Sequence, residues 1–203
     1  MADRTKAPPV DRRRQILDAA IRVFARQGFN ACRVSDIAQE ANVAYGLVYH
    51  YFNSKDEVLN ELFTERWSLL LAAIEEVDGQ AIGAREKLDA VARFIVDSYR
   101  YEPDLMKVII VEVTRAANSF GRTHLPEIRR AYDMIAKIVA DGQASGAFRG
   151  DVAPMFASMA FYGAIEQLLS GWIFGTIPAS DADFDQARDL LVTTICDGLE
   201  PRG

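Results

Sequence analysis

One short segment of the chain gathers groups that can donate hydrogen bonds and carries no acid. Residues 44–52 read AYGLVYHYF, with hydroxyl or imidazole groups on Tyr45, Tyr49, His50 and Tyr51. Such groups donate to anionic oxygens, and a segment without carboxylates does not repel a polyanion. This chemistry suits contact with phosphates and with the edges of nucleic acid bases.

Gly46 lies inside the same segment, where a helix would be about 1 kcal/mol less stable than with alanine. Close approach of the backbone to a partner would explain a glycine at this position. Ordinary roles remain open for its neighbours. Tyr49 can be a core aromatic residue with its hydroxyl pointing outward, and His50 can be a solvated histidine.

Other kinds of chemistry find little support in the sequence. His124 is the second of two histidines, Cys32 and Cys196 stand far apart, and the patterns HExxH, GxSxG and CxxC are absent. We therefore expect no enzyme activity, no cofactor and no metal site. Both cysteines are expected to be spectators in a reducing compartment.

Three predicted helices position the segment. The first begins at Arg12, has apolar residues at helical spacing, and stops at Gly28. A second follows Ser35 as its N-cap, a tight turn falls at Asn42, and the third covers 44–51. Two short helices joined by such a turn, with a preceding helix that completes a small core, are typical of a helix-turn-helix.

The helical spacing of apolar residues in the rest of the chain predicts an all-α fold of about nine helices. Ser54 and Glu57 form a capping box that opens a long fourth helix. Breaks rich in Gly and Pro separate five more helices, at about 84–101, 104–117, 125–145, 153–174 and 182–199. We expect a disordered arm at 1–10, a helix-turn-helix domain at 11–55 and a helical domain at 56–203.

Charge is distributed unevenly along the chain, whose net charge is −6. The first 53 residues carry eight Lys and Arg against five Asp and Glu, whereas the rest carries 15 against 24. A basic head on an acidic body predicts an electrostatic footprint for nucleic acid at one end. Ordinary solvated charge is the alternative.

This head resembles the TetR family of transcriptional regulators. The resemblance rests on ILDAAIRVFARQGF at 16–29 and on VSDIAQEANVAYGLVYHYFNSKDEVL at 34–59. It implies a repressor that holds a double-stranded DNA operator. The implied phosphate contacts are Ser35, Tyr49, Tyr51 and Lys55. The implied base-edge or groove contacts are Arg33, Tyr45, Gly46 and Leu47.

Two positions depart from the family pattern. Ala44 and Leu47 stand where the family often has a hydroxyl residue. Sequence readout is therefore expected to rest more on Tyr45, on His50 and on apolar contact with thymine methyl groups.

The segment at 156–174, FASMAFYGAIEQLLSGWIF, is apolar nearly all round. Such a helix needs both a core and a second partner, which we expect to be the same helix of a second subunit. Together with the helix at 182–199, and in line with the resemblance, it would form a four-helix homodimer interface. Two-fold symmetry would match a palindromic operator.

The resemblance further implies a pocket for a hydrophobic small-molecule effector among the helices between 84 and 174. The candidate lining residues are aromatic or large and apolar: Phe94, Tyr99, Met106, Ile110, Phe120, Tyr132, Phe161 and Tyr162. Each of them has plain core or dimer packing as its alternative.

Within the family, this half more loosely resembles the repressors that respond to fatty-acyl-CoA and control fatty-acid metabolism, through VEVTRAANSFGRTHLPEIRRAYDMI and FYGAIEQLLSGWIF. An acyl chain would fill the core, and its phosphorylated head would meet Arg115, Arg122, Arg129 and Arg130. Pairing of these arginines with surface carboxylates is the alternative. An efflux-type regulator that senses a drug-like or aromatic compound is the competing function.

Nothing in the sequence predicts a membrane partner. No run approaches the roughly 18 to 20 apolar residues of a transmembrane helix. The first residues, MADRTKAPPVDRRR, lack the apolar region of a secretory signal. We expect a cytoplasmic location.

Overall fold

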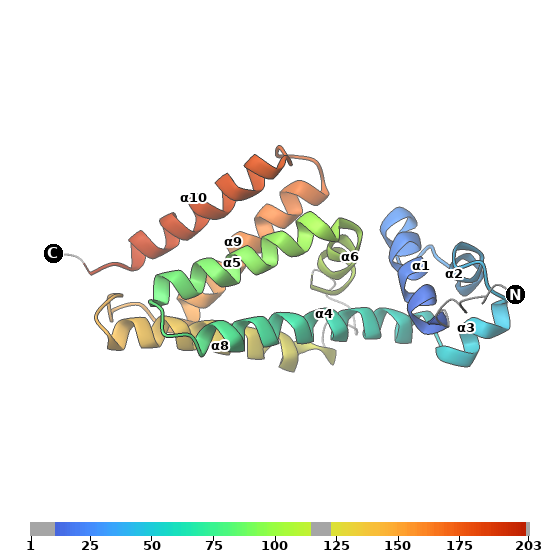
Figure 1. Ribbon diagram of the computed structural model, residues 1–203, viewed down its shortest axis with the longest axis horizontal. Coiled ribbons are helices and arrows are strands. Elements are labelled where there is room, and N and C mark those ends of the chain that lie inside the picture. Colours follow the sequence, from blue (N-terminus) through green and yellow to red (C-terminus); the bar gives the residue numbers. More distant parts are fainter. Residues whose placement is uncertain (1–10, 115–122, 202–203) are drawn as a thin grey trace, which may run out of the picture. The chain divides into compact units, whose positions relative to one another are not determined.

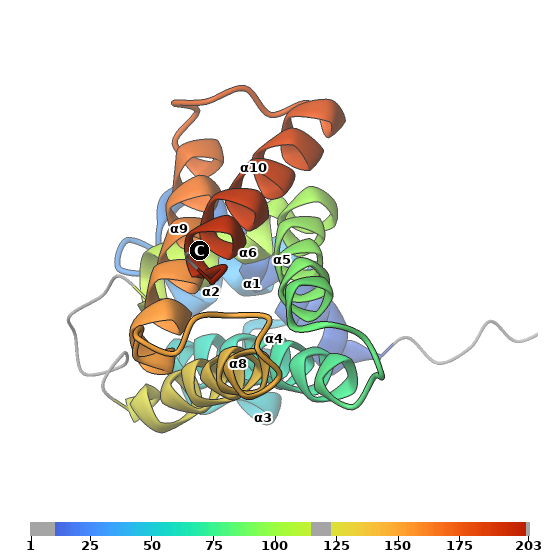
Figure 2. The same ribbon diagram turned by 90° about the vertical axis from the view of Figure 1, so that its left-hand side faces the viewer.

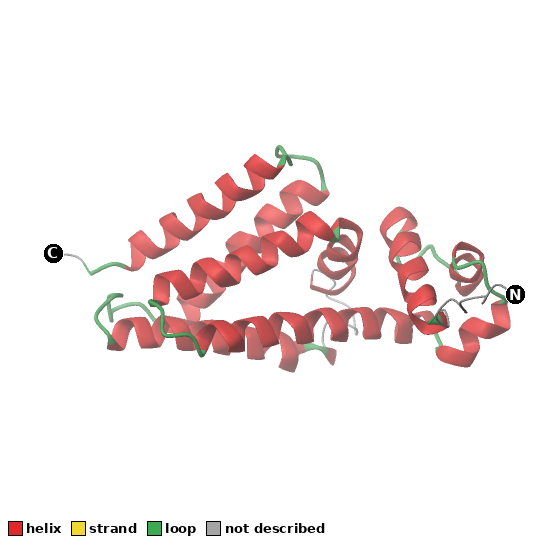
Figure 3. Cartoon of the chain, in the orientation of Figure 1, coloured by secondary structure: helices red, strands yellow, loops and turns green. Residues whose placement is uncertain are grey.

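The computed structural model describes residues 11–114 and 123–201. The predicted arm and the candidate ligand residues Arg115, Phe120 and Arg122 lie outside these ranges. The described chain forms nine α-helices, one π-helical stretch and no strand (Figure 3). The prediction of an all-α fold is therefore confirmed.

The chain divides into two compact units, residues 1–62 and 63–203. The first unit holds α1 (Arg12–Gln27), α2 (Val34–Glu40), α3 (Tyr45–Tyr51) and the first turns of α4 (Lys55–Asp78) (Figure 1). This division falls later than the expected boundary at residue 55, because the first turns of α4 bury Val58, Leu59 and Leu62.

Local signals set most helix ends in the first unit. Gly28, with φ of 80°, ends α1, and Asn42 adopts a left-handed φ of 51° in the turn between α2 and α3. Ser54 Oγ accepts the N–H of Glu57 at 3.1 Å, which is half of the predicted capping box, whereas the Glu57 carboxylate accepts the N–H of Asn53 at 2.7 Å. The stop at Gly28, the turn at Asn42 and the cap by Ser54 are confirmed.

The predicted cap at Ser35 is wrong. The N-cap of α2 is Arg33, whose backbone N–H donates to the carboxylate of Asp36 at 2.8 Å. Ser35 is the second residue of the helix, and its hydroxyl lies 3.5 Å from Asp36. The carboxylate reaches back over the first turn, so the helix begins one residue before the serine.

The second unit contains the rest of α4 and all later elements. These are α5 (Ala84–Tyr101), α6 (Pro103–Val108), η1 (Ile109–Thr114), α8 (Leu125–Ala144), α9 (Pro154–Ile173) and α10 (Asp181–Leu199). Helix α5 packs against α8, α9 and α10, and α9 packs against α8 and α10 (Figures 1 and 2). The core of the unit therefore lies among these four helices, and α4 closes it on one side through the hydrogen bond from Trp67 Nε1 to the carbonyl of Glu127 at 2.9 Å.

The helix predicted at about 104–117 takes a different form. Helix α6 ends at Val108, and the π-helix η1 follows it from Ile109 to Thr114. Five of the six η1 residues are β-branched. Branched side chains crowd the preceding turn of an α-helix, and a wider turn relieves that crowding.

Candidate functional site

The exposed face of α3 carries a pair of tyrosines one helical turn apart. Tyr45 is 54% exposed and Tyr49 is 44% exposed. Their rings meet edge to face at 5.1 Å, and the hydroxyl of Tyr45 donates to that of Tyr49 at 3.2 Å. Large aromatic side chains left this exposed on a small unit indicate a surface that binds a partner.

Gly46 lies on the same face and has no packing reason to be a glycine. A Cβ on Gly46 would meet no atom of the described residues within 4 Å, apart from its own helix. Gly142 is the opposite case, because a Cβ there would lie 2.5 Å from Cδ2 of Phe148. Gly46 therefore destabilises α3 without an internal benefit, which points to close approach by something outside the protein.

The other predicted contact residues are distributed around this face. Arg33, Ser35, Ala44 and His50 are exposed. Leu47 and Tyr51 are half-buried, so each presents part of its side chain to the surface. The predicted residues of α2 and α3 are thus exposed or half-exposed, whereas Val48 between them in α3 is buried.

Lys55 is engaged within the protein. Its Nζ donates to the carbonyls of Phe29 at 2.7 Å and Cys32 at 3.0 Å, and lies 4.4 Å from the centre of the Phe29 ring. A third carbonyl, of Asn30, lies at 3.4 Å. The ammonium therefore ties the loop after α1 to the start of α4, a role that the sequence did not predict.

Replacing Lys55 by methionine separates the two roles of this residue. The loop carbonyls lose a charged donor, and we expect the first unit to lose about 1–3 kcal/mol of stability. Hydrogen exchange at residues 29–33 will report this loss as faster exchange. If Lys55 also touches a phosphate, the slope of DNA affinity against salt concentration falls by about one charge; an unchanged slope assigns it to the loop alone.

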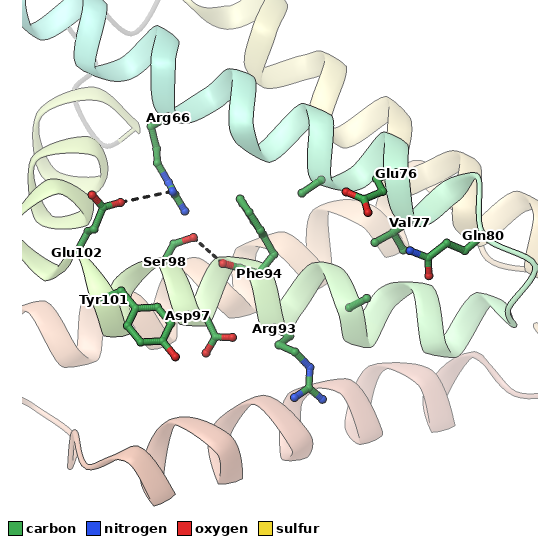
Figure 4. A pocket seen from close by; sticks show the side chains of 12 residues that line it. Arg66, Glu76, Val77, Gln80, Arg93, Phe94, Asp97, Ser98, Tyr101 and Glu102 are labelled. Carbon is green, nitrogen blue, oxygen red and sulfur yellow. Dashed lines mark hydrogen bonds and ion pairs between the residues drawn. The ribbon is translucent and has the colours of Figure 1, made fainter.

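The second unit contains a cavity of about 500 Å³ between α4 and α5 (Figure 4). Charged and polar residues are among those that line it, including Glu76, Gln80, Arg93 and Asp97. Arg66 of α4 points into it, facing Glu102 and the Phe94 ring (Figure 4). The cavity is therefore polar at its rim and has one buried cation inside.

A smaller apolar space of about 20 Å³ continues inward. Arg66, Phe94 and Ser98 line both spaces. Four candidate ligand residues line the inner one: Phe94, Met106, Ile110 and Tyr162. Burial raises the pKa of Tyr162, so its hydroxyl remains neutral.

Four other candidate ligand residues lie elsewhere. Tyr99 stacks on Trp172 at 5.6 Å, and Phe161 is fully buried in the core. Tyr132 packs edge-on against Tyr162 at 5.3 Å, without lining either space. Arg129 is exposed and pairs with Asp133 at 3.8 Å, which is the surface pairing that the sequence left open.

Sequence reasoning missed Arg66 as a site residue. A signal was present, because Phe63, Arg66 and Leu70 follow one another at helical spacing on the apolar stripe of α4. A charge on such a stripe is usually read as a solvated edge. The structure instead buries the Arg66 side chain to 9% exposure.

Helices α9 and α10 share an apolar groove of about 470 Å³, with Leu168, Ile177 and Leu190 among its lining residues. On the same two helices, large apolar side chains stand open to solvent: Phe156 is 72% exposed, Met159 52% and Leu190 67%. Apolar surface of this extent marks an interaction site.

Two models of known protein families match this chain, one in each half. Residues 16–62 match the family described as "Bacterial regulatory proteins, tetR family", and residues 85–195 match "Tetracyclin repressor-like, C-terminal domain". The chain belongs to the TetR family. The fatty acid metabolism regulator protein of Bacillus subtilis is 30% identical over 87% of this chain and 87% of its own length.

Two solved structures of TetR-family regulators are similar over nearly the whole chain. FadR from Bacillus halodurans, a fatty acid degradation regulator, has a TM-score of 0.83 and 25% identity, with 98% of this chain and all of that chain covered. FadR from Bacillus subtilis, solved in complex with stearoyl-CoA, has a TM-score of 0.80 and 25% identity, with 92% and 99% covered. Membership of this family of DNA-binding regulators confirms the helix-turn-helix prediction for the first unit.

The remaining titratable residues are consistent with a regulator of this family. His124 is buried against Phe63, with ring centres 4.2 Å apart, and burial lowers the pKa of its imidazole. Both cysteines are buried and free, and burial raises the pKa of Cys196 to about 11.

Across the described ranges, every helix is too short or too polar to cross a lipid bilayer.

Proposed function

We propose that this TetR-family protein is a repressor that binds a palindromic operator as a homodimer and is released by a hydrophobic small-molecule effector. The observation that carries the DNA half is the exposed face of α3, where Gly46 and two open tyrosines have no internal function. In a helix-turn-helix, this second helix of the motif enters the major groove.

Contacts to DNA divide into two groups under this proposal. Tyr49, Tyr51 and Ser35 bind phosphates, with Lys55 as a further candidate. Tyr45, Arg33, His50 and the small or apolar residues Ala44, Gly46 and Leu47 approach base edges. Hydroxyl groups of Ser35 on α2 and of Tyr49 and Tyr51 near the end of α3 would hold the register, while the residues of the second group read the sequence.

The dimer would form through α9 and α10. The apolar groove between these helices and the exposed Phe156, Met159 and Leu190 support this assignment. A two-fold interface uses the same patch on both subunits, so each exposed side chain is covered twice. The two α3 helices would then sit about 34–36 Å apart on successive major grooves.

A long-chain acyl-CoA is the effector class that we favour. Support comes from the cavity with a polar rim and apolar interior, and from the relatives named above. Binding would act through α4, which contributes residues to both units. If the ligand and DNA favour different arrangements of α4, the bound ligand lowers the affinity of the protein for DNA. Bound DNA lowers the affinity for the ligand by the same factor.

A gel-shift experiment on the DNA upstream of the protein's own gene tests this function. We expect a shift at low salt that palmitoyl-CoA reverses. A folded dimer that binds no fragment would contradict the DNA half. A stable shift that palmitoyl-CoA leaves intact, but that an aromatic drug-like compound reverses, would favour the efflux-type alternative.

The two exposed tyrosines should respond differently to loss of their hydroxyls. We expect Tyr49→Phe to weaken binding about threefold to tenfold on all DNA sequences, because it removes one phosphate contact. Tyr45→Phe should instead change the ranking of operator variants in a competition assay. Because the hydroxyls are hydrogen-bonded to each other, the double variant should lose less than the sum of the two single losses.

A further inference from the structure

Arg66 is a buried cation with poor internal pairing. Its side chain is 9% exposed, and its nearest carboxylate, on Glu102, lies 3.8 Å from Nη1, beyond hydrogen-bonding distance. Its guanidinium carbon lies 5.1 Å from the centre of the Phe94 ring. A guanidinium has five N–H donors. In the described part of the chain, the acceptor that faces them is one distant carboxylate, that of Glu102.

Such an arrangement is unfavourable for the folded protein by itself. The guanidinium nitrogens face the open cavity, where water still reaches them, and a single long ion pair from within the protein stabilises the charge little. Desolvation also lowers the pKa of Arg66, against the opposing effect of Glu102. An anion with two oxygens, placed in the adjoining cavity, would satisfy the donors that the protein leaves unmatched.

The position of Arg66 sets the orientation of such a ligand. Together with Phe94 and Ser98 it lines both the outer cavity and the inner apolar space. The inner walls are apolar, and Met106 among them has the flexible side chain that can move aside for a larger group. A headgroup at Arg66 would therefore direct an apolar tail inward.

We propose that Arg66 anchors the acidic headgroup of the effector, a carboxylate or a phosphate, and that the headgroup displaces Glu102. This inference rests on the proposed function and names the group that recognises the ligand. Glu102 joins α5 to α6: its N–H donates to the Ser98 carbonyl at 3.1 Å, and its carbonyl accepts the N–H of Met106 at 3.0 Å. Releasing its carboxylate from Arg66 removes a tie between α4 and this junction.

The test is Arg66→Met, measured by calorimetric titration with palmitate and with palmitoyl-CoA. Methionine keeps most of the volume and removes the charge. We expect affinity for at least one ligand to fall about 30-fold or more, since charge-assisted bidentate bonds are lost. The affinity of Arg66→Lys, which retains the charge without the planar fork, should lie between those of the wild type and Arg66→Met. A loss of affinity for palmitate identifies a carboxylate headgroup. A loss of affinity for palmitoyl-CoA identifies a phosphate headgroup.

Two controls separate anchoring from a structural role. Arg85→Met changes another arginine of α5, which lines neither space, is 43% exposed and is paired with Asp197, and should alter affinity less than about threefold. In urea, ligand-free Arg66→Met should unfold at the same or a higher concentration than the wild type, because a poorly paired buried charge has been removed. Glu102→Gln, which removes the competing carboxylate, should bind about threefold to tenfold more tightly.

The inference is overturned if the wild type binds neither probe, if Arg66→Met binds both with wild-type affinity, or if it loses no more affinity than Arg85→Met. It is also overturned if Arg66→Met unfolds more easily in parallel with its loss of affinity. A wild type that binds no operator would instead contradict the proposed function, while the ligand titrations keep their meaning.

Discussion

Gly46→Ala is expected to stabilise the protein and to weaken its binding to DNA. Gly46 is the second residue of α3, where alanine is favoured over glycine by less than the roughly 1 kcal/mol of a helix interior, and the new Cβ meets nothing within the described structure. On the operator the same methyl group enters the space between α3 and the base edges. A steric misfit of about 1–3 kcal/mol would lower affinity roughly tenfold to hundredfold.

The opposite signs of the two effects make this variant informative. Thermal unfolding measures the gain in stability, and fluorescence anisotropy with a labelled operator measures the loss of affinity. Gly198→Ala is the matched control, because Gly198 is also an exposed glycine in a helix with open space around its Cβ, but lies in α10. If Gly46→Ala binds the operator as tightly as Gly198→Ala, α3 does not approach the bases at this position.

Leu190→Arg is expected to convert the dimer into monomers and to abolish specific DNA binding. Leu190 is 67% exposed in the single chain, so the substitution leaves the subunit core intact. In a two-fold interface the new charge occurs twice and is buried without a partner, which costs several kcal/mol. A monomer holds one half-site, and operator affinity should fall more than about a hundredfold.

Sedimentation velocity will measure the oligomeric state, and circular dichroism will verify that helix content is retained. Leu69→Arg is the control, since Leu69 is a similarly exposed leucine, at 55%, on α4. It should remain dimeric and bind DNA. A Leu190→Arg protein that sediments as a dimer would place the interface away from the α9–α10 groove.

The sequence by itself determined the features that depend on a few neighbouring residues. The stop at Gly28, the left-handed turn at Asn42 and the cap at Ser54 each act within about one helical turn, so their types and order are sufficient. The prediction of where α2 starts failed because Ser35 and Asp36 are both good capping residues. Whether the serine or the carboxylate takes the role depends on backbone geometry that the letters do not contain.

Only the tertiary structure decided which side chains meet across the chain. Phe94 and Phe161 are the same residue type on apolar helix faces, yet packing rotates the first toward the cavity and the second into the core. Lys55 has the expected type for a phosphate contact, but the loop after α1 folds back and brings three carbonyls to its ammonium.

Tyr45, Gly46 and Tyr49 were predictable because an exposed face needs no partner from elsewhere in the chain. Arg66 was not, because its burial depends on α5 and on Glu102, which the α5–α6 junction carries to within 3.8 Å. Sequence alone therefore located the exposed face of α3 that we propose reads DNA, because that face depends on one local helix. The proposed ligand site required the assembled unit, because Arg66 is buried only when distant helices pack around it.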